Sequence, residues 1–148
     1  MFEELKNIIL SGESYPIKCD LVVLEKIQEE FGSISEFESL LIPWEPKLDE
    51  EGKEVRGKEG KTLFQARFPS IKAVNSALYL MVKEGEEIIA ECENRAPKVL
   101  SRNQIARRCD LTPLDIADQL HDEFLRCLRV KNGETTQNQT EETKKSSS

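Results

Sequence analysis

The chain has 148 residues, a formal net charge of −7 and hydrophobic residues at 38% of positions, a composition typical of one soluble domain. No apolar run approaches the roughly 18 residues that span a bilayer, and the acidic N-terminus lacks the features of a secretory signal. We therefore expect a cytosolic protein. The first 41 residues hold nine acidic residues against three lysines, so this surface is expected to repel nucleic acid. A solvated helix face and a docking surface for a basic partner both explain that acidity.

The N-terminal segment predicts a small β-hairpin followed by a helix. Residues 6–19 contain two short runs separated by turn residues, and Pro16 places the second run at a sheet edge. Asp20 is a good N-cap and Gly32 a good C-terminal residue for a helix spanning 21–31. Its predicted buried stripe consists of Leu21, Leu24, Ile27 and Phe31.

A second, shorter helix follows, with Ser35 and Glu38 as its capping box and Pro43 as its stop. Its apolar face consists of Phe37, Leu40 and Leu41. The stretch 43–62 is rich in glycine and charge, and it predicts an exposed loop or loose ribbon of a length that tends to be functional. The residues expected to tie it down are Trp44, Leu63, Phe64 and Phe68.

The most hydrophobic helix comes next and is predicted to lie at the centre of the domain. Ser70 caps it, Ile71–Glu84 reads as continuous helix, and Gly85 is predicted to end or kink it before a continuation over Glu86–Cys92. Its two apolar faces consist of Ile71, Val74, Leu78 and Met81, and of Ala73, Ala77 and Leu80.

Two helices close the domain. Ser101 and Gln104 predict a capping box for a short helix ending near Arg108, and Thr112 followed by Pro113 predicts a helix to about residue 129. The expected buried stripe of this last helix is Leu114, Ala117, Leu120, Phe124 and Leu128, with an exposed ion pair between Asp122 and Arg126.

These elements predict a mainly α fold. It is a single domain of about five helices over residues 1–130, with a small N-terminal β-hairpin and the exposed charged loop 43–62. The remaining residues, 131–148, are polar or charged and are expected to form a disordered tail.

The sequence offers little material for catalysis or for a metal or cofactor. His121 is the only histidine, and with Asp118 and Asp122 it is interpreted as part of a solvated helix face. The four cysteines form no CxxC pair and are expected to be reduced and mostly buried in helices; they are Cys19, Cys92, Cys109 and Cys127. We therefore expect a non-catalytic protein without cofactors that works by binding other proteins.

Residues 104–120 resemble a helix-turn-helix, two amphipathic helices joined by a short turn. A recognition helix needs basic or amide side chains near its start, whereas this one begins with Asp115 and Asp118. A plain helical hairpin is therefore favoured over DNA binding.

The order of several segments is similar to that of tail assembly chaperones of Gram-positive siphophages and prophages. The matching segments are 15–18 (YPIK), leading into a helix that ends at 29–33 (EEFGS), then 69–85 (PSIKAVNSALYLMVKEG) and 111–124 (LTPLDIADQLHDEF). Each motif alone is a capped core pattern, and their order and spacing carry the resemblance.

The resemblance implies a short-form chaperone that binds the tape measure protein in the host cytoplasm and is absent from the mature virion. It also implies two further interactions to test, which are binding to tail tube subunits and self-association around the client. Whether a longer frameshifted form exists is a question for the nucleotide sequence around Lys144 and Lys145.

Five residues are predicted to contact the client: Trp44, Phe64, Phe68, Leu24 and Ile27. For Trp44 the alternative interpretation is a cap on the core of the second helix, and its exposure distinguishes the two. The alternative function is a small phage or prophage regulator or adaptor that uses residues 104–120 to bind DNA or a host protein.

Overall fold

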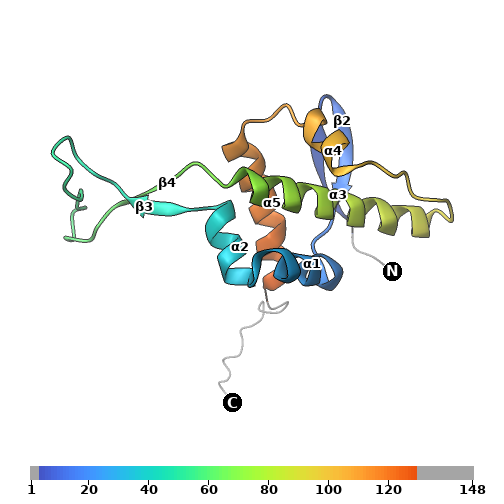
Figure 1. Ribbon diagram of the computed structural model, residues 1–148, viewed down its shortest axis with the longest axis horizontal. Coiled ribbons are helices and arrows are strands. Elements are labelled where there is room, and N and C mark those ends of the chain that lie inside the picture. The colour runs from blue at the N-terminus through green and yellow to red at the C-terminus, as the bar shows by residue number, and fades with distance from the viewer. Residues whose placement is uncertain (1–3, 130–148) are drawn as a thin grey trace, which may run out of the picture.

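The computed structural model describes residues 4–129, which form a helical body with a long arm projecting from one end (Figure 1). This confirms the mainly α fold and the N-terminal hairpin, while the predicted tail 131–148 lies outside the described residues. Nowhere in 4–129 is a helix long and apolar enough to cross a membrane. In chain order the elements are β1 Lys6–Leu10, β2 Glu13–Ile17, α1 Leu21–Phe31, α2 Ile34–Leu41, β3 Trp44–Pro46, β4 Phe64–Ala66, α3 Ile71–Cys92, α4 Arg102–Arg108 and α5 Pro113–Leu128.

The hairpin β1–β2 is antiparallel and closes through a two-residue turn. Ser11 and Gly12 have φ angles of 52° and 79°, the left-handed geometry that matches the twist of a tight hairpin. Ile8, Leu10 and Ile17 are buried in the core, so one face of this small sheet is covered by the helical body.

The caps of α1 and α2 show how closely the two helices follow each other. Asp20 accepts a hydrogen bond from the Val23 N–H and begins α1 as predicted. The predicted capping box of Ser35 and Glu38 is wrong, because Ser33 accepts the hydrogen bond from the first turn of α2 and the helix begins at residue 34. Two competing N-cap residues stand two positions apart, and the one next to the end of α1 is used.

Helix α3 runs through the middle of the body, with α1 and α2 on one side and the hairpin and α4 on the other (Figure 1). It continues through Gly85 without interruption, so the predicted end or kink there is wrong. Gly85 instead allows β2 to cross the helix, since a Cβ atom at this position would lie 2.2 Å from the Pro16 carbonyl oxygen. A hydrogen bond of 3.1 Å from the Lys18 N–H to the Met81 carbonyl joins the two elements nearby.

The buried face of α1 is rotated from the predicted stripe. Val23 and Ile27 are buried, Leu24 is half-buried, and Leu21 is 81% exposed because it lies in the first turn, at the margin of the body. The stripe of α5 is shifted in the same way, since Leu114 and Leu128 at its two ends are exposed. The residues that α5 buries are Ile116, Ala117, Leu120, Glu123 and Phe124.

A buried carboxylate fastens α5 to the segment before α1. Glu123 is 1% exposed, and its Oε2 accepts hydrogen bonds from the Cys19 N–H at 2.7 Å and from Arg126 Nη2 at 2.6 Å. Arg126 also donates to the Cys19 carbonyl at 2.8 Å. The predicted pair of Asp122 with Arg126 is therefore wrong, because the guanidinium turns toward the buried acid one residue further along.

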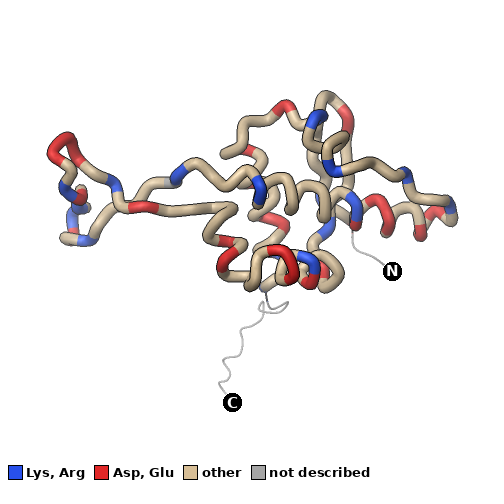
Figure 2. The backbone as a smooth tube through the Cα atoms, viewed as in Figure 1, with Lys and Arg blue, Asp and Glu red and all other residues tan. Residues whose placement is uncertain are grey.

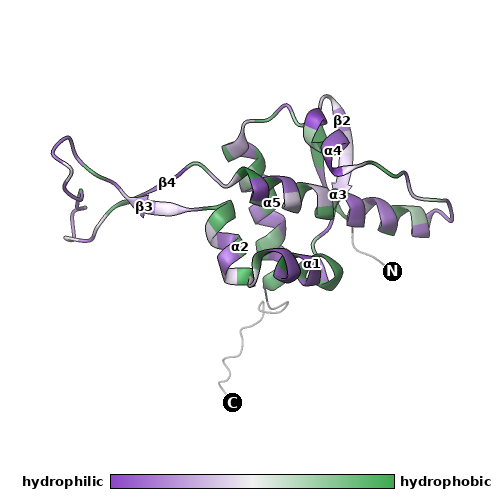
Figure 3. Ribbon diagram, in the orientation of Figure 1, coloured by the Kyte–Doolittle hydropathy of each residue, from purple (hydrophilic) through white to green (hydrophobic). Residues whose placement is uncertain are grey.

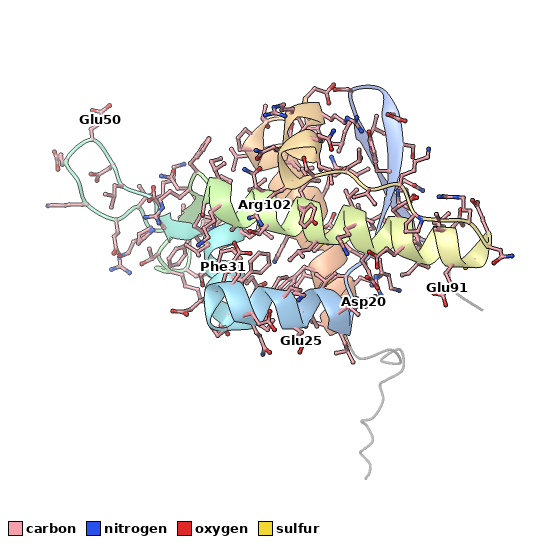
Figure 4. The ribbon with its side chains drawn as sticks, turned by 45° about the vertical axis from the view of Figure 1, so that its right-hand side comes forward. Asp20, Glu25, Phe31, Glu50, Glu91 and Arg102 are labelled. Atoms are coloured by element: carbon pink, nitrogen blue, oxygen red, sulfur yellow. The ribbon has the colours of Figure 1, made fainter. Side chains whose placement is uncertain are left out.

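A second polar cluster joins α1, α3 and α4. Ser76 is fully buried and donates to Glu30 Oε2 at 2.8 Å, and Arg102 lies 3.4 Å from the same oxygen and also donates to Ser76. Figure 4 shows Arg102 directed from α4 toward α3. These hydrogen bonds satisfy polar groups that would otherwise be costly to bury.

The cysteines are free thiols, as expected, but only partly in the expected surroundings. Cys19 is buried in the segment before α1 rather than in a helix, and burial together with the neighbouring Cys127 raises the pKa of its thiol. Cys92 at the end of α3 is exposed. Cys109 is half-buried just after α4, and Cys127 is half-buried within α5. None of the four is both buried and helical, so the expectation of cysteines mostly buried in helices is wrong.

The contact of Glu84 with Asp20 predicts that stability depends on pH. Burial and a hydrogen bond with the Asp20 carboxyl raise the pKa of Glu84 from 4.5 to about 7. A carboxyl with a raised folded-state pKa contributes stability that is complete below its unfolded pKa and is lost as pH rises through its folded pKa. We expect the free energy of unfolding to fall between about pH 4.5 and 7 on account of this group.

Glu84→Gln is expected to reduce that fall, since a glutamine side chain does not ionise. Urea denaturation at pH 5 and pH 8 measures the effect, and Glu91→Gln, at an exposed position of the same helix, is the matched control. An equal pH dependence in the wild type and Glu84→Gln would contradict the assignment.

Candidate protein-binding surface

Residues 43–67 form the arm, a twisted ribbon rather than an open loop (Figure 1). At its base β3 and β4 pair antiparallel, with Trp44 opposite Ala66 and Pro46 opposite Phe64. Further out the chain makes two tight turns, where Gly52 and Gly60 have φ angles of 83° and 77°. The arm is thus an ordered projection held by backbone hydrogen bonds, which agrees with the ribbon that was one of the two predictions for 43–62.

The two faces of the ribbon differ in character. Because side chains alternate along a strand and paired residues share a face, Trp44, Pro46 and Phe64 lie on one side. The other side carries Glu45 and Gln65, whose side chains are joined by a hydrogen bond of 3.2 Å. The base of the arm is therefore amphipathic, with an aromatic face and a polar face.

The polar face extends through Arg67, whose Nε lies 3.9 Å from a Glu45 carboxylate oxygen. The backbone pairing extends one residue beyond β4, because the Arg67 N–H donates to the Pro43 carbonyl at 2.8 Å. From the alternation of side chains along this extended segment, we infer that the next residue, Phe68, lies on the aromatic side. Ala66 is the residue opposite Trp44, and Phe64 and Phe68 lie two residues before and two residues after it along the chain. The three aromatic residues share one face.

The aromatic residues are not covered by the body. Trp44 is 62% exposed, Phe64 58% and Phe68 61%, so the prediction that they tie the arm down is wrong. The interpretation of Trp44 as a cap on the core of α2 is wrong for the same reason. Three large exposed aromatic side chains on one face are unusual for a soluble surface and typical of binding sites.

The exposed apolar surface continues from the arm onto the body. Leu40 at the end of α2 is 42% exposed and Ile71 at the start of α3 is 46% exposed. These two helix ends are adjacent, because the Ser70 N–H donates to the Leu40 carbonyl at 2.9 Å. We call the set the arm surface; its residues are Leu40, Trp44, Phe64, Phe68 and Ile71.

The other two residues predicted to contact the client do not belong to this surface. Ile27 is fully buried and Leu24 is half-buried against the core, so neither side chain is part of the exposed apolar surface of the arm. Sequence reasoning missed Leu40 and Ile71 as surface residues, because both fit the apolar faces of their helices. Only their positions at helix ends, next to the base of the arm, hinted at exposure.

Charge is concentrated in the outer half of the arm (Figure 2). Acidic and basic residues are interspersed there, and the hydropathy colours of the same region are mainly hydrophilic (Figure 3). Glu50 lies at the tip (Figure 4). The charged tip favours solubility of the projection, while its base offers apolar contacts close to the body.

His121 belongs to a contact between helices rather than to a solvated face. Its Nε2 lies 2.8 Å from Glu38 Oε2, its side chain is 19% exposed, and its ring stacks on Phe124. The solvated-face interpretation is therefore wrong for His121, although Asp118 and Asp122 are exposed as expected. Across the described chain, no group of three or more His, Cys, Asp or Glu side chains is placed to hold a metal ion.

The segment 104–120 does not fold as a simple hairpin of two helices. Helix α4 packs mainly on α3, and α5 packs on α3 and α2. Asp115 and Asp118 are exposed near the start of α5. Their negative charge faces solvent at the point where a recognition helix would approach phosphates.

No protein-family model, curated protein or solved structure matches this chain. The similarity to tail assembly chaperones therefore rests on the order and spacing of segments within the sequence.

Proposed function

We propose that this protein is a non-catalytic tail assembly chaperone that binds amphipathic helices of a tape measure protein on its arm surface. The observation that carries the proposal is the aromatic face of the arm, where Trp44, Phe64 and Phe68 are all more than half exposed. Removing such exposed aromatic surface from water is favourable, so a partner that covers these side chains gains binding free energy.

A helical client suits the shape of the arm surface. The ribbon provides a narrow row of apolar side chains, and Leu40 and Ile71 extend it onto the body. An amphipathic helix presents a comparable stripe through its i, i+3, i+4 and i+7 positions. Tape measure proteins, as the family resemblance describes them, are long and helical, and their apolar faces need cover before the tail tube forms.

The resemblance supplies the biological setting of the proposal. It implies that the protein acts in the host cytoplasm during tail morphogenesis and is absent from the mature virion, with tail tube subunits as later partners. The acidic N-terminal part of the chain supports a protein partner over nucleic acid.

Co-expression with the tape measure protein encoded by the same gene cluster tests this function. The wild type is expected to keep the tape measure soluble and to elute with it on size exclusion. Replacing Trp44, Phe64 and Phe68 together by serine is expected to weaken binding by about 100-fold or more, since each buried aromatic anchor contributes upwards of about 1 kcal/mol. The free energy of unfolding should change by less than about 0.5 kcal/mol, because these side chains are exposed.

The matched control replaces Glu45, Gln65 and Arg67 by serine on the opposite face of the same ribbon. This variant is expected to retain the complex. An insoluble tape measure in the presence of the wild type would contradict the proposed function. A complex that survives the aromatic triple substitution would contradict the proposed surface.

A further inference from the structure

A second site lies on the other part of the body, between β2 and the end of α3. A cavity of about 330 Å³ opens there, with β2, α3, α4 and the irregular segment 97–100 as its walls. Its apolar lining includes Tyr15, Pro16, Tyr79, Val82, Leu100 and Ile105. We call this cavity the slot. The arm surface lies at the start of α3, so the two sites are separated along the helix (Figure 1).

One wall of the slot is the outer edge of β2, which α3 covers at Pro16 and which is exposed at Ser14. Pro16 is paired with Asn7 across the hairpin, and its carbonyl is directed at Gly85 of α3, away from β1. Because backbone groups point alternately to the two sides of a strand, the N–H and carbonyl of Ser14 face the same way as the Pro16 carbonyl. Ser14 therefore presents one donor and one acceptor at the slot, in the geometry that a further strand would pair with.

In the described part of the chain, the opposite wall also contains backbone groups that are not paired with other backbone groups. The segment 97–100 returns along α3 toward α4 (Figure 1), and within residues 4–129 no hydrogen bond joins its backbone to another backbone group. Its one anchored amide is the Lys98 N–H, which donates to Glu86 Oε2 at 2.8 Å. Val99 in the middle is 89% exposed. The slot thus lies between two stretches of chain whose peptide groups are available for pairing.

The charges around the slot favour an acidic occupant. Glu86 and Glu87 are already neutralised by Arg95 and Lys83, at 2.7 Å and 2.6 Å. Arg108 donates only to the Tyr15 hydroxyl, at 3.2 Å, in the described part of the chain. Glu13 also lines the slot and accepts a hydrogen bond from the Tyr15 hydroxyl at 2.9 Å. Within residues 4–129, the charges at the slot without an ion-pair partner are therefore two positive ones, on Arg108 and Lys98, against one negative one, on Glu13.

We propose that the slot binds an extended peptide segment in which an acidic side chain is flanked by apolar ones. The peptide adds as a strand beside Ser14, its apolar side chains enter between Tyr79 and Val82, and its carboxylate pairs with Arg108. This binding mode is independent of the helical client on the arm surface. It gives the protein a second recognition site of different chemistry.

The test titrates the full-length, ¹⁵N-labelled protein with the blocked peptide acetyl-Thr-Val-Glu-Val-Thr-amide and follows the amide resonances by NMR. Shifts are expected at Ser14, Val99, Leu100 and Arg108. A peptide with lysine in place of glutamate is expected to bind about tenfold more weakly, as is a peptide with N-methylated valines, which cannot pair as a strand.

Two charge variants sharpen the result. Arg108→Glu is expected to lose the preference for glutamate over lysine, whereas Arg107→Glu, one residue away and exposed outside the slot, should keep it. Lys98→Glu, at an exposed position of the segment 97–100, is a second test of the preference for glutamate over lysine. This variant leaves the contact of Arg108 with Tyr15 unchanged.

Several outcomes would overturn the proposal. One is the absence of slot shifts with the glutamate peptide at millimolar concentration. Another is equal binding of the glutamate, lysine and N-methylated peptides, which indicates a non-specific apolar contact. A third is equal binding by acetate alone, which indicates an anion site without peptide recognition. The aromatic triple variant of the arm should bind the peptide like the wild type, so failure here is distinguishable from failure of the proposed function.

Discussion

Glu123→Ala is expected to lower the free energy of unfolding by about 3 kcal/mol, because it breaks a buried ion pair and leaves polar groups without partners. The Cys19 N–H loses its acceptor, and Arg126 keeps its charge beside the core without a counter-ion. The effect lies toward the low end for buried pairs because the Arg126 side chain is 39% exposed and water partly replaces the carboxylate.

Urea denaturation at constant pH measures the change, with Asp122→Ala as the matched control. Asp122 is the neighbouring residue on α5 and is exposed, so its replacement is expected to change stability by less than about 0.5 kcal/mol. Equal effects of the two substitutions would show that Glu123 does not fasten α5 to the segment before α1.

Gly85→Ala is expected to destabilise the protein by about 3 kcal/mol, although alanine is the better helix former by about 1 kcal/mol. The added Cβ would lie 2.2 Å from the Pro16 carbonyl oxygen and 2.9 Å from the Ile17 nitrogen. These are backbone atoms, so the clash is relieved only if β2 moves off α3.

Thermal denaturation and far-ultraviolet circular dichroism separate the gain in helix propensity in Gly85→Ala from the clash of the added Cβ with β2. Helix content should be retained while the melting temperature falls. Glu91→Ala, at an exposed position of the same helix, should leave the melting temperature nearly unchanged. A rise in melting temperature in Gly85→Ala would mean that helix propensity decides and that β2 does not press on this position.

Local signals were the most predictable part of the fold. The caps at Asp20, Ser70, Ser101 and Thr112 were each predicted from the sequence, because a cap depends on a side chain and a backbone group three residues apart. Gly85 shows the limit of such reasoning. A glycine that ends a helix and one that lets another strand approach look alike in sequence, and only the tertiary packing distinguishes them.

Tertiary partners were the least predictable part. Periodicity places Asp122 and Glu123 on neighbouring faces of α5 without showing which of them meets Arg126 in the interior. The same holds for the candidate site. Trp44 and Ile27 are both apolar, and an apolar pattern alone does not show that one lies exposed on an arm and the other is enclosed by several helices.

The single tryptophan offers the most direct test of the central claim, since Trp44 lies on the arm surface and all tryptophan emission comes from it. A tryptophan-free helical fragment of the tape measure protein is titrated into the wild type while emission and acrylamide quenching are recorded. We expect a shift of Trp44 emission to shorter wavelength and protection from acrylamide, both saturating with complex formation. A complex that forms on size exclusion with no change in emission or quenching would contradict client binding at the arm surface, because the client would then bind elsewhere.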